Sequence, residues 1–395
     1  MSYTSPNQSR SPLYNLLLAT GLLIVLGSLL AVHEMESQGH IITGMNNQIV
    51  WGLPHVFAIF LIVAASGVLN VSSIGSVFNK PAYKARGPLA GLLSIAMLGG
   101  GLMVLMLDLG RPDRVIVAAT NYNPTSVFAW NVLLYSGMFA AVVVYLWTMM
   151  EKRMYPWSKP AGLLVFVWRF VLTTGTGLIF AFLGARQAYG SAILPPMFII
   201  LSFAWGLAVF HIVQSSIFAW NGIRQDEYVQ KRMRNLMGVF VVSGLYFVVT
   251  YHLTNFYFSR QSAFEYFILR DGGIYPQLFW WGYIVIGNLL PLLLIFHPAL
   301  GKSKSVIGAS LAIILGGFAF LYVFIIGGQA FPLDIFHGYA VSSTFGDGEI
   351  AAYRPSVYEA LLGLGGLGVA FMITAIGIHV LNFVPREIPT KVGHH

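Results

Sequence analysis

The hydrophobic positions of this chain fall into ten long runs that are almost free of charged side chains. Each run is close to the ~20 residues that an α-helix needs to cross the hydrocarbon core of a bilayer. Every backbone polar group in lipid must be satisfied within its own segment or within a closed barrel, so unbroken runs of this length predict helices. The expected membrane spans are 13–33, 51–76, 88–108, 126–150, 161–184, 194–219, 236–258, 275–297, 305–327 and 357–384.

The composition favours an all-α polytopic membrane protein with ten transmembrane helices. Hydrophobic residues make up 57% of the chain and charged residues only 9%, whereas about 25% charged residues is typical of soluble domains. The first run is longer than the apolar core of a signal peptide, and His33-Glu34-Met35-Glu36 follows it instead of a small-residue cleavage site. We therefore expect a retained span. The chain has no cysteine, which excludes disulfides and an iron–sulfur cluster or thiolate metal site held by this chain alone.

The distribution of Lys and Arg predicts the orientation. The N-terminal segment, the loops after the even-numbered spans and the C-terminal segment hold 15 of the 22 basic residues, and the opposite loops hold six. This positive-inside asymmetry predicts that both termini, with tails 1–12 and 385–395, lie in the cytoplasm. We expect a multi-pass protein of the bacterial inner membrane, in which the loop from Asp108 to Pro124 faces the periplasm.

A repeat is suggested by four landmarks that recur in the same order, 141 to 152 residues apart. We expect two four-helix units, 51–192 and 193–332, between flanking segments 13–50 and 333–384. Each unit has an even number of spans, so the two copies share one orientation, as in the parallel repeats of some transporters. The landmark pairs are Leu53-Pro54 with Leu194-Pro195, Asp108 with His252, Asn123-Pro124 with Tyr275-Pro276, and Gln187 with Gln329.

The stretch from Leu102 to Trp147 carries the most distinctive chemistry. One span ends on the carboxylate of Asp108, a Gly-Arg-Pro-Asp-Arg turn follows, and the next span re-enters at Asn123-Pro124. An ionisable group that faces lipid is costly, so Asp108 is expected to face protein or water and is a candidate functional group. The alternative is that Asp108 and Arg111 form an ion pair that only fixes the turn.

Two segments of this region, and a third in the preceding span, resemble a known family. LDLGRPDR, followed by NPTSVFAWNVLLYSGM, and WGLPHVFAIFLIVAASG one span earlier resemble the NrfD-like membrane subunits of polysulfide-reductase type complexes. Ten spans without extra domains are most similar to the branch with DsrP, the Hme-type subunit and the quinone subunits of alternative complex III. The resemblance implies menaquinone or ubiquinone as substrate near the outer face, and no haem or iron–sulfur cluster on this chain. It also implies a periplasmic ferredoxin-like iron–sulfur partner, with a cytochrome c or b and further membrane subunits as additional candidates.

Quinone chemistry moves two electrons and two protons, so its site needs ring surface, hydrogen-bond partners and a proton relay. His55 can exchange a proton near neutral pH, Asp108 is a candidate proton carrier, and Arg111 is expected to orient Asp108. Each candidate also has a purely structural alternative. His55 could bond a loop carbonyl, His33 and Glu34 could form a solvated helix end, and Trp130 and Tyr135 could belong to the aromatic belt at the membrane interface. The topology brings further candidates to the same depth, namely His33, Glu34, Asn123, Trp130 and Tyr135.

Polar residues deeper in the spans suggest a proton path. Arg169 lies about ten residues into the fifth span, His211 lies in the inner part of the sixth, and His252 lies in the seventh. Arg169 could instead snorkel to the inner interface. We expect no metal site.

The sequence therefore predicts a quinone-interacting subunit of a respiratory or sulfur-metabolism electron-transfer complex, and leaves open whether electron transfer drives proton translocation. A secondary transporter with parallel repeats is one alternative, with broken helices expected near the midplane of both units. A di-haem cytochrome b is another, with His211 and His297 or His55 and His252 as haem ligands.

Overall fold

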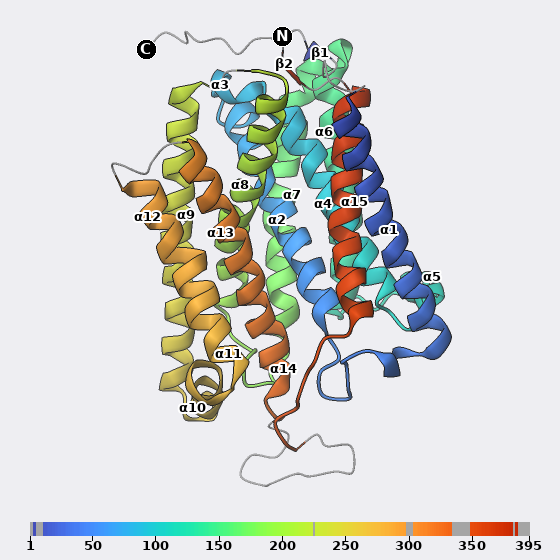
Figure 1. Cartoon of the computed structure of the whole chain (residues 1–395), viewed down its shortest axis with the longest axis vertical. Coiled ribbons are helices and arrows are strands. Elements are labelled where there is room, and N and C mark those ends of the chain that lie inside the picture. Colours follow the sequence, from blue (N-terminus) through green and yellow to red (C-terminus); the bar gives the residue numbers. More distant parts are fainter. Residues whose placement is uncertain are drawn as a thin grey trace.

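The computed structural model describes residues 3–4, 11–223, 226–297, 303–333, 348–381 and 384–385. It is a bundle of long helices (Figure 1), and the predicted all-α class and ten spans are confirmed. Most of the expected tails 1–12 and 385–395, and the loop 334–347, lie outside the described residues. Eight spans are single helices: α1 (Pro12–Gln38), α2 (Leu53–Ser76), α4 (Gly87–Leu107), α6 (Val127–Met150), α7 (Ser158–Ala181), α8 (Leu194–Trp220), α9 (Glu227–Tyr257) and α15 (Val357–Leu381). The eighth span consists of α11 (Ile274–Gln277), η5 (Leu278–Leu289) and α12 (Leu290–Phe296), and the ninth of α13 (Ser303–Leu321), η6 (Tyr322–Gly327) and α14 (Gly328–Ala330).

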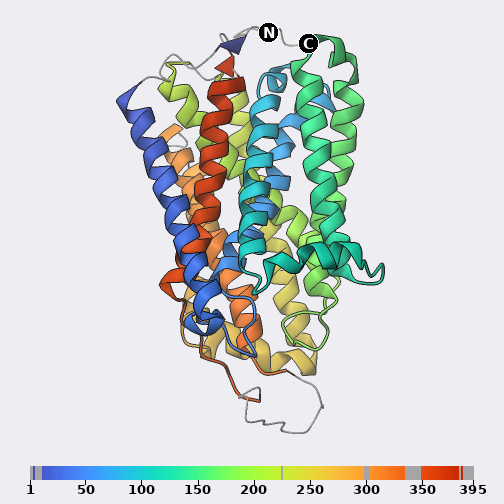
Figure 2. The same cartoon turned by 90° about the vertical axis from the view of Figure 1, so that its right-hand side faces the viewer.

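Short elements mark the two ends of the bundle. At one end, called here the termini end, strand β1 (Tyr3–Thr4) pairs antiparallel with β2 (Val384–Pro385). The opposite end, called the loop end, carries α5 (Val115–Thr120) and α10 (Ser259–Tyr266); Figure 2 shows α5 projecting sideways from the bundle. The remaining short helices are α3 (Pro81–Lys84) and 3₁₀ turns at His40–Ile42, Pro112–Arg114 and Lys152–Trp157.

Helix α2 lies at the centre of the bundle and packs on α4, α7, α8, α13 and α15, while α1 packs mainly on α15. Its crossing with α8 depends on two glycines. A Cβ added at Gly67 would lie 1.7 Å from the carbonyl oxygen of Ser202, and one added at Gly206 would lie 2.3 Å from the carbonyl carbon of Gly67. Small residues allow such close helix contacts in membranes.

Several π-helical segments lie between α9 and α15. These are Phe267–Asp271, Leu278–Leu289 and Tyr322–Gly327. Within the second segment the Asn288 side chain donates to the carbonyl of Tyr283, five residues earlier. By contrast, α2, α4, α6 and α7 are continuous α-helices. The transporter alternative requires broken helices in both expected four-helix units. The four helices α2, α4, α6 and α7, which are the spans of the first unit, are not broken.

Candidate functional site

The loop end of α2 and α4 brings two of the predicted residues together. His55 lies in the first turn of α2, and Asp108 caps the end of α4. The His55 Nδ1 atom lies 2.7 Å from Asp108 Oδ2. The Asp108 side chain is 1% exposed, whereas that of His55 is 17% exposed. The pair is therefore a buried carboxylate in contact with an imidazole that still reaches the surface.

Trp51, at the end of the α1–α2 loop, lies against the exposed side of this pair. The Trp51 ring stacks on His55, with centroids 5.9 Å apart and planes 24° apart. The Trp51 ring also lies near Phe180, with centroids 5.6 Å and planes 86° apart, and near Phe128, with centroids 6.4 Å apart. Trp51 was not among the predicted site residues, because only the fold shows that its ring lies over His55.

The backbone next to Trp51 is fixed by Gln329 from the end of the ninth span. The Gln329 Oε1 atom accepts hydrogen bonds from the backbone N–H groups of Val50 and Trp51, both at 3.0 Å, and its Nε2 donates to the Trp51 carbonyl at 3.0 Å. Arg186 donates to the carbonyls of Gln329 and Gln48 at 3.1 and 2.7 Å. Burial lowers the pKa of Arg186. These bonds hold the loop in one position in front of His55.

A buried carboxylate on α15 fixes the start of α2. Glu359 accepts hydrogen bonds from the Tyr353 hydroxyl at 2.6 Å and from the N–H groups of Gly44 and Ser356 at 2.8 and 2.7 Å. The Tyr353 hydroxyl in turn accepts from the N–H of Leu53, the first residue of α2, at 2.6 Å. Burial and the hydrogen bond to Glu359 raise the pKa of the Tyr353 hydroxyl. Sequence reasoning missed both residues, since Glu359 looks like an ordinary acidic residue in the first turn of a helix.

The expected contact between Arg111 and Asp108 is wrong. Arg111 forms a two-pronged hydrogen-bonded ion pair with Asp113, with both distances 3.1 Å. Both side chains are more than 60% exposed. The turn places Arg111 three residues past the helix end, where its guanidinium finds the nearest carboxylate in the same turn instead of the buried one.

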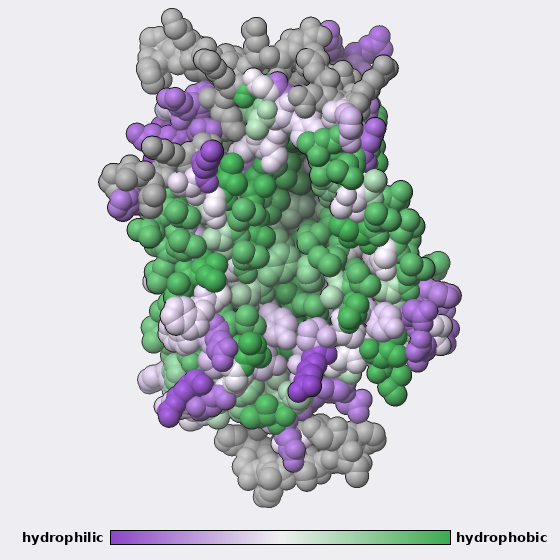
Figure 3. Space-filling view, viewed as in Figure 1, coloured by the Kyte–Doolittle hydropathy of each residue, from purple (hydrophilic) through white to green (hydrophobic). Residues whose placement is uncertain are grey.

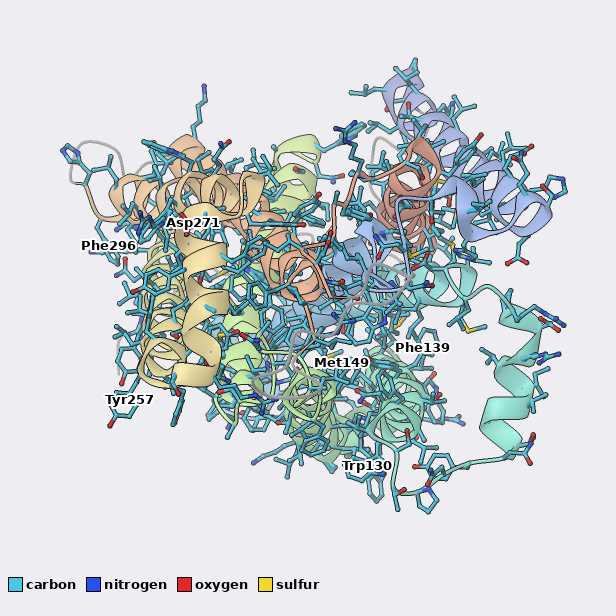
Figure 4. The ribbon with its side chains drawn as sticks, turned by 90° about the horizontal axis from the view of Figure 1, so that it is seen from below. Trp130, Phe139, Met149, Tyr257, Asp271 and Phe296 are labelled. Carbon is cyan, nitrogen blue, oxygen red and sulfur yellow. The ribbon has the colours of Figure 1, made fainter. Side chains whose placement is uncertain are left out.

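Most of the other outer candidates do not join the His55–Asp108 pair. His33 and Asn123 are exposed, and Glu34 accepts a hydrogen bond from Gln38 one turn away. The Trp130 indole donates to the carbonyl of Pro124. In Figure 4, seen from the loop end, Trp130 lies at the periphery of the bundle. Tyr135 is buried on α6, and its hydroxyl forms a hydrogen bond with Thr176 on α7.

A second histidine–carboxylate pair lies at the same end, between α9 and α10. His252 Nδ1 lies 2.6 Å from Glu265 Oε2, and the Asn255 side chain donates to Glu265 Oε1 at 2.7 Å. Phe279 meets the His252 ring edge-on at 4.8 Å. Glu265 is fully buried, and it was not predicted, since the expected landmark at this position was His252 alone.

The deeper candidates lie in separate places. Arg169 is buried, donates to Asn70 Oδ1 at 2.6 Å, and lies over the rings of Phe166 and Phe170. It therefore does not snorkel to the interface. His211 Nδ1 lies 3.3 Å from the Ser310 hydroxyl. Within the part of the chain that the structure describes, no group of three or more His, Cys, Asp or Glu side chains could hold a metal ion.

Comparison with known proteins identifies the family. A family model described as polysulphide reductase, NrfD, matches residues 42–333. The chain belongs to the NrfD family. It is a multi-pass membrane protein. The matched segment contains the two histidine–carboxylate pairs described above, together with Gln329 and Trp51, whereas Tyr353 and Glu359 lie beyond it.

Named relatives cover most of the sequence. It is 28% identical to the Hdr-like menaquinol oxidoreductase integral membrane subunit of Archaeoglobus fulgidus, over 89% of each protein. It is 20% identical to the C subunit of selenate reductase from Mesobacillus selenatarsenatis, over 94% of this protein and 95% of the relative. It is 22% identical to the C polypeptide of polysulfide reductase from Wolinella succinogenes, over 72% of this protein and 96% of the relative. All three relatives are components of reductases or oxidoreductases.

Proposed function

We propose that the chain is the quinone-interacting membrane subunit of an electron-transfer complex, with its site at His55 and Asp108. The observation that carries this proposal is the 2.7 Å contact between a buried carboxylate and a partly exposed imidazole beneath the Trp51 ring. Membership of the NrfD family and similarity to a menaquinol oxidoreductase subunit support a quinone as the substrate.

Quinol oxidation gives His55, Asp108 and Trp51 distinct roles in this site. Oxidation of a quinol releases two electrons and two protons, and each proton needs an acceptor within hydrogen-bond reach of the substrate oxygen. Asp108 faces Nδ1 of His55, so Nε2 is the ring nitrogen that remains for a substrate hydroxyl. Nε2 takes the first proton, and Asp108 stabilises the imidazolium that forms. Because the His55 side chain is partly exposed, the ring releases this proton to water and then accepts the second proton at Nε2. Trp51 supplies the flat apolar surface for the quinone ring.

The electrons leave to an iron–sulfur partner subunit, since this chain has no cysteine for a cluster of its own. We place this partner at the loop end, on the periplasmic side, with both termini in the cytoplasm. The excess of Lys and Arg in the loops of the termini end supports this orientation.

We also propose that the bundle contains the two parallel four-helix units suggested by the sequence. Asn70 and Arg169 form a hydrogen bond, and the residues 141 positions later, His211 and Ser310, also lie in contact. At the loop end, each unit also forms a hydrogen bond with the other. Gln329 from the second unit binds Trp51 in the first, and the carbonyl of Ala188 from the first unit accepts from Tyr251 in the second.

The second histidine–carboxylate pair is a candidate for proton exchange between the membrane faces. In this proposal His252 and His211 carry protons through the second four-helix unit. Arg169 lies in the first unit, at about the membrane depth of His211. Proton uptake by vesicles containing the intact complex, followed with a pH dye during quinol oxidation, tests it. His211→Leu and His252→Leu should each lower the number of protons taken up per quinol, while unchanged stoichiometry in both would contradict the path.

Quenching of tryptophan fluorescence by a quinol analogue tests the quinone site directly. Saturable quenching of the purified chain should weaken about tenfold or more in His55→Ala and Asp108→Asn, which corresponds to at least about 1.4 kcal/mol of binding free energy. Asp113→Asn is the matched control, because it changes a neighbouring but exposed carboxylate. Absent quenching, or equal quenching in all four proteins, would contradict the site.

A further inference from the structure

The face of the bundle between α13 and α15 carries an apolar groove of about 700 Å³ that is lined by α1, α2, α4, α8, α13 and α15. Its volume lies within the range of about 300–1,000 Å³ found for ligand-binding pockets. In Figure 3 this face is hydrophobic, and its surface is hollowed between the two helices in the half toward the termini end. The groove exists because α15 packs on α1, α2 and α4, whereas α13 packs on α8 and on the π-helical segment Leu278–Leu289.

The groove has the length of one bilayer leaflet. On α8 its lining extends from Val209 to Asn221, and on α15 from Leu367 to Ile378. At 1.5 Å per residue these segments span about 16–18 Å. Half of the hydrocarbon core is about 15 Å thick. The groove therefore reaches from near the bilayer midplane to the interface at the termini end.

The groove is separated from the His55 site. Phe60 and Phe318 stack at 4.2 Å near the midplane end of the groove. Phe60 and Leu61 follow His55 by five and six residues on α2, so at about 100° per residue they point more than 100° away from it. A molecule in the groove thus lies across α2 from the quinone site, and the tail of a quinone bound at His55 would have to pass around the helix to reach it.

Most side chains that line the groove are large. Leu, Ile, Val and Phe side chains such as Leu93, Ile212 and Phe371 form most of the walls. Helix–helix contacts in membranes favour small residues that let the backbones approach, as Gly67 and Gly206 do at the α2–α8 crossing. A transmembrane helix of a partner subunit is therefore a poor fit, whereas flexible hydrocarbon chains can follow such walls.

The polar side chains of the groove gather at its termini end. Tyr14, Trp220 and Asn221 lie there, and the His379 ring lies 6.0 Å from the Tyr14 ring. Tyr and Trp are typical of the membrane–water interface. The loops at this end also hold most of the basic residues, which attract anionic lipid head groups.

We infer that this groove binds the two acyl chains of one anionic membrane phospholipid, with its head group beside Tyr14 and Asn221. The lipid joins the α1–α15 pair to α8 and α13 and excludes other ligands from this face. The inference does not depend on the quinone site.

Native mass spectrometry of the full chain, released from micelles containing palmitoyl-oleoyl phosphatidylglycerol, tests the proposal. One lipid should remain bound per protein. Ser216→Trp, which fills the groove from an exposed position on α8, should lower the retained fraction about tenfold. Ala219→Trp is the matched control, since Ala219 is exposed on the same helix but outside the lining, and it should retain the lipid.

Four outcomes would overturn the inference. These are no retained lipid, equal retention in both variants, displacement of the lipid by a short-chain quinone, and a dimer whose formation is blocked by Ser216→Trp. Quinol quenching at His55 should be unchanged in Ser216→Trp, so a failure here is distinguishable from a failure of the proposed function.

Discussion

Gln329 binds the backbone of Trp51 through both of its side-chain groups, although 278 residues separate the two. Its carbonyl oxygen accepts from the Trp51 N–H and its amide group donates to the Trp51 carbonyl. Because Trp51 stacks on His55, the end of the ninth span sets the position of the ring above the candidate catalytic histidine. The site thus depends on residues from both halves of the chain.

Replacing Gln329 with Ala should weaken binding of a quinol analogue about tenfold. The change removes the bonds to Val50 and Trp51, and each protein hydrogen bond contributes about 0.5–1.5 kcal/mol. Fluorescence quenching of the purified chain measures the effect. Gln187→Ala changes the residue that corresponds to Gln329 in the proposed repeat and should alter binding less than twofold; equal losses in the two variants would contradict the assigned role of Gln329.

Arg111→Ala should leave quinol binding within about twofold of the original value and the free energy of unfolding within about 0.5 kcal/mol. The reason is that Arg111 pairs with Asp113 at the exposed surface and does not touch Asp108. Binding titrations and thermal unfolding in detergent measure both effects. A loss as large as that of Asp108→Asn would show that the guanidinium acts on the buried carboxylate.

Tyr353→Phe should lower thermal stability at neutral pH and flatten its decline at alkaline pH. The folded protein holds the Tyr353 pKa above its usual value, so the folded state binds the proton more tightly than the unfolded chain does. The stability that the folded protein gains from this tighter proton binding is fully present below about pH 10, the ordinary tyrosine pKa. It is lost as the pH rises toward the raised pKa of the folded state. Melting temperatures between about pH 8 and 11 test this, with the exposed Tyr257→Phe as control.

Gly52→Ala should destabilise the start of α2. A Cβ at this position would lie 2.3 Å from Glu359 Oε1 and 2.8 Å from the Tyr353 hydroxyl. Such overpacking costs about 1–3 kcal/mol, and the shift of the helix start should also weaken quinol binding. Thermal unfolding and quenching measure the two effects. Gly39→Ala tests a glycine with open space around it but a positive φ, so it should affect stability without affecting binding.

Arg169→Lys should lower the free energy of unfolding by about 1–3 kcal/mol. Lysine keeps the charge but cannot stack its head group on Phe166 and Phe170 while bonding Asn70, as the planar guanidinium does. The melting temperature in detergent measures the change, and Lys159→Arg, at an exposed position near the start of the same helix, is the control. An unchanged melting temperature would show that only the charge of Arg169 matters.

The ten spans, the all-α class and the family could be predicted from the sequence alone. These features are local, since a run of about twenty apolar residues must form a helix in lipid whatever surrounds it. His55 and Asp108 could also be selected, because an ionisable group at a span end is conspicuous in a chain with 9% charged residues.

Which other residues complete the candidate site follows from the packing of the helices and could not be predicted from the sequence. Arg111 is three residues from Asp108 but turns away from it. By contrast, Gln329, Tyr353 and Glu359 come from segments far along the chain, and they fix the backbone at Trp51 and at the start of α2. Glutamine, tyrosine and glutamate are common at helix ends, so nothing in the sequence marks these residues as part of a site. Their role depends on which backbone N–H and C=O groups the helix packing leaves without a partner. Hydropathy fixes each helix separately, but side-chain contacts between helices depend on rotation and crossing, which are set by packing details such as Gly67 against Gly206.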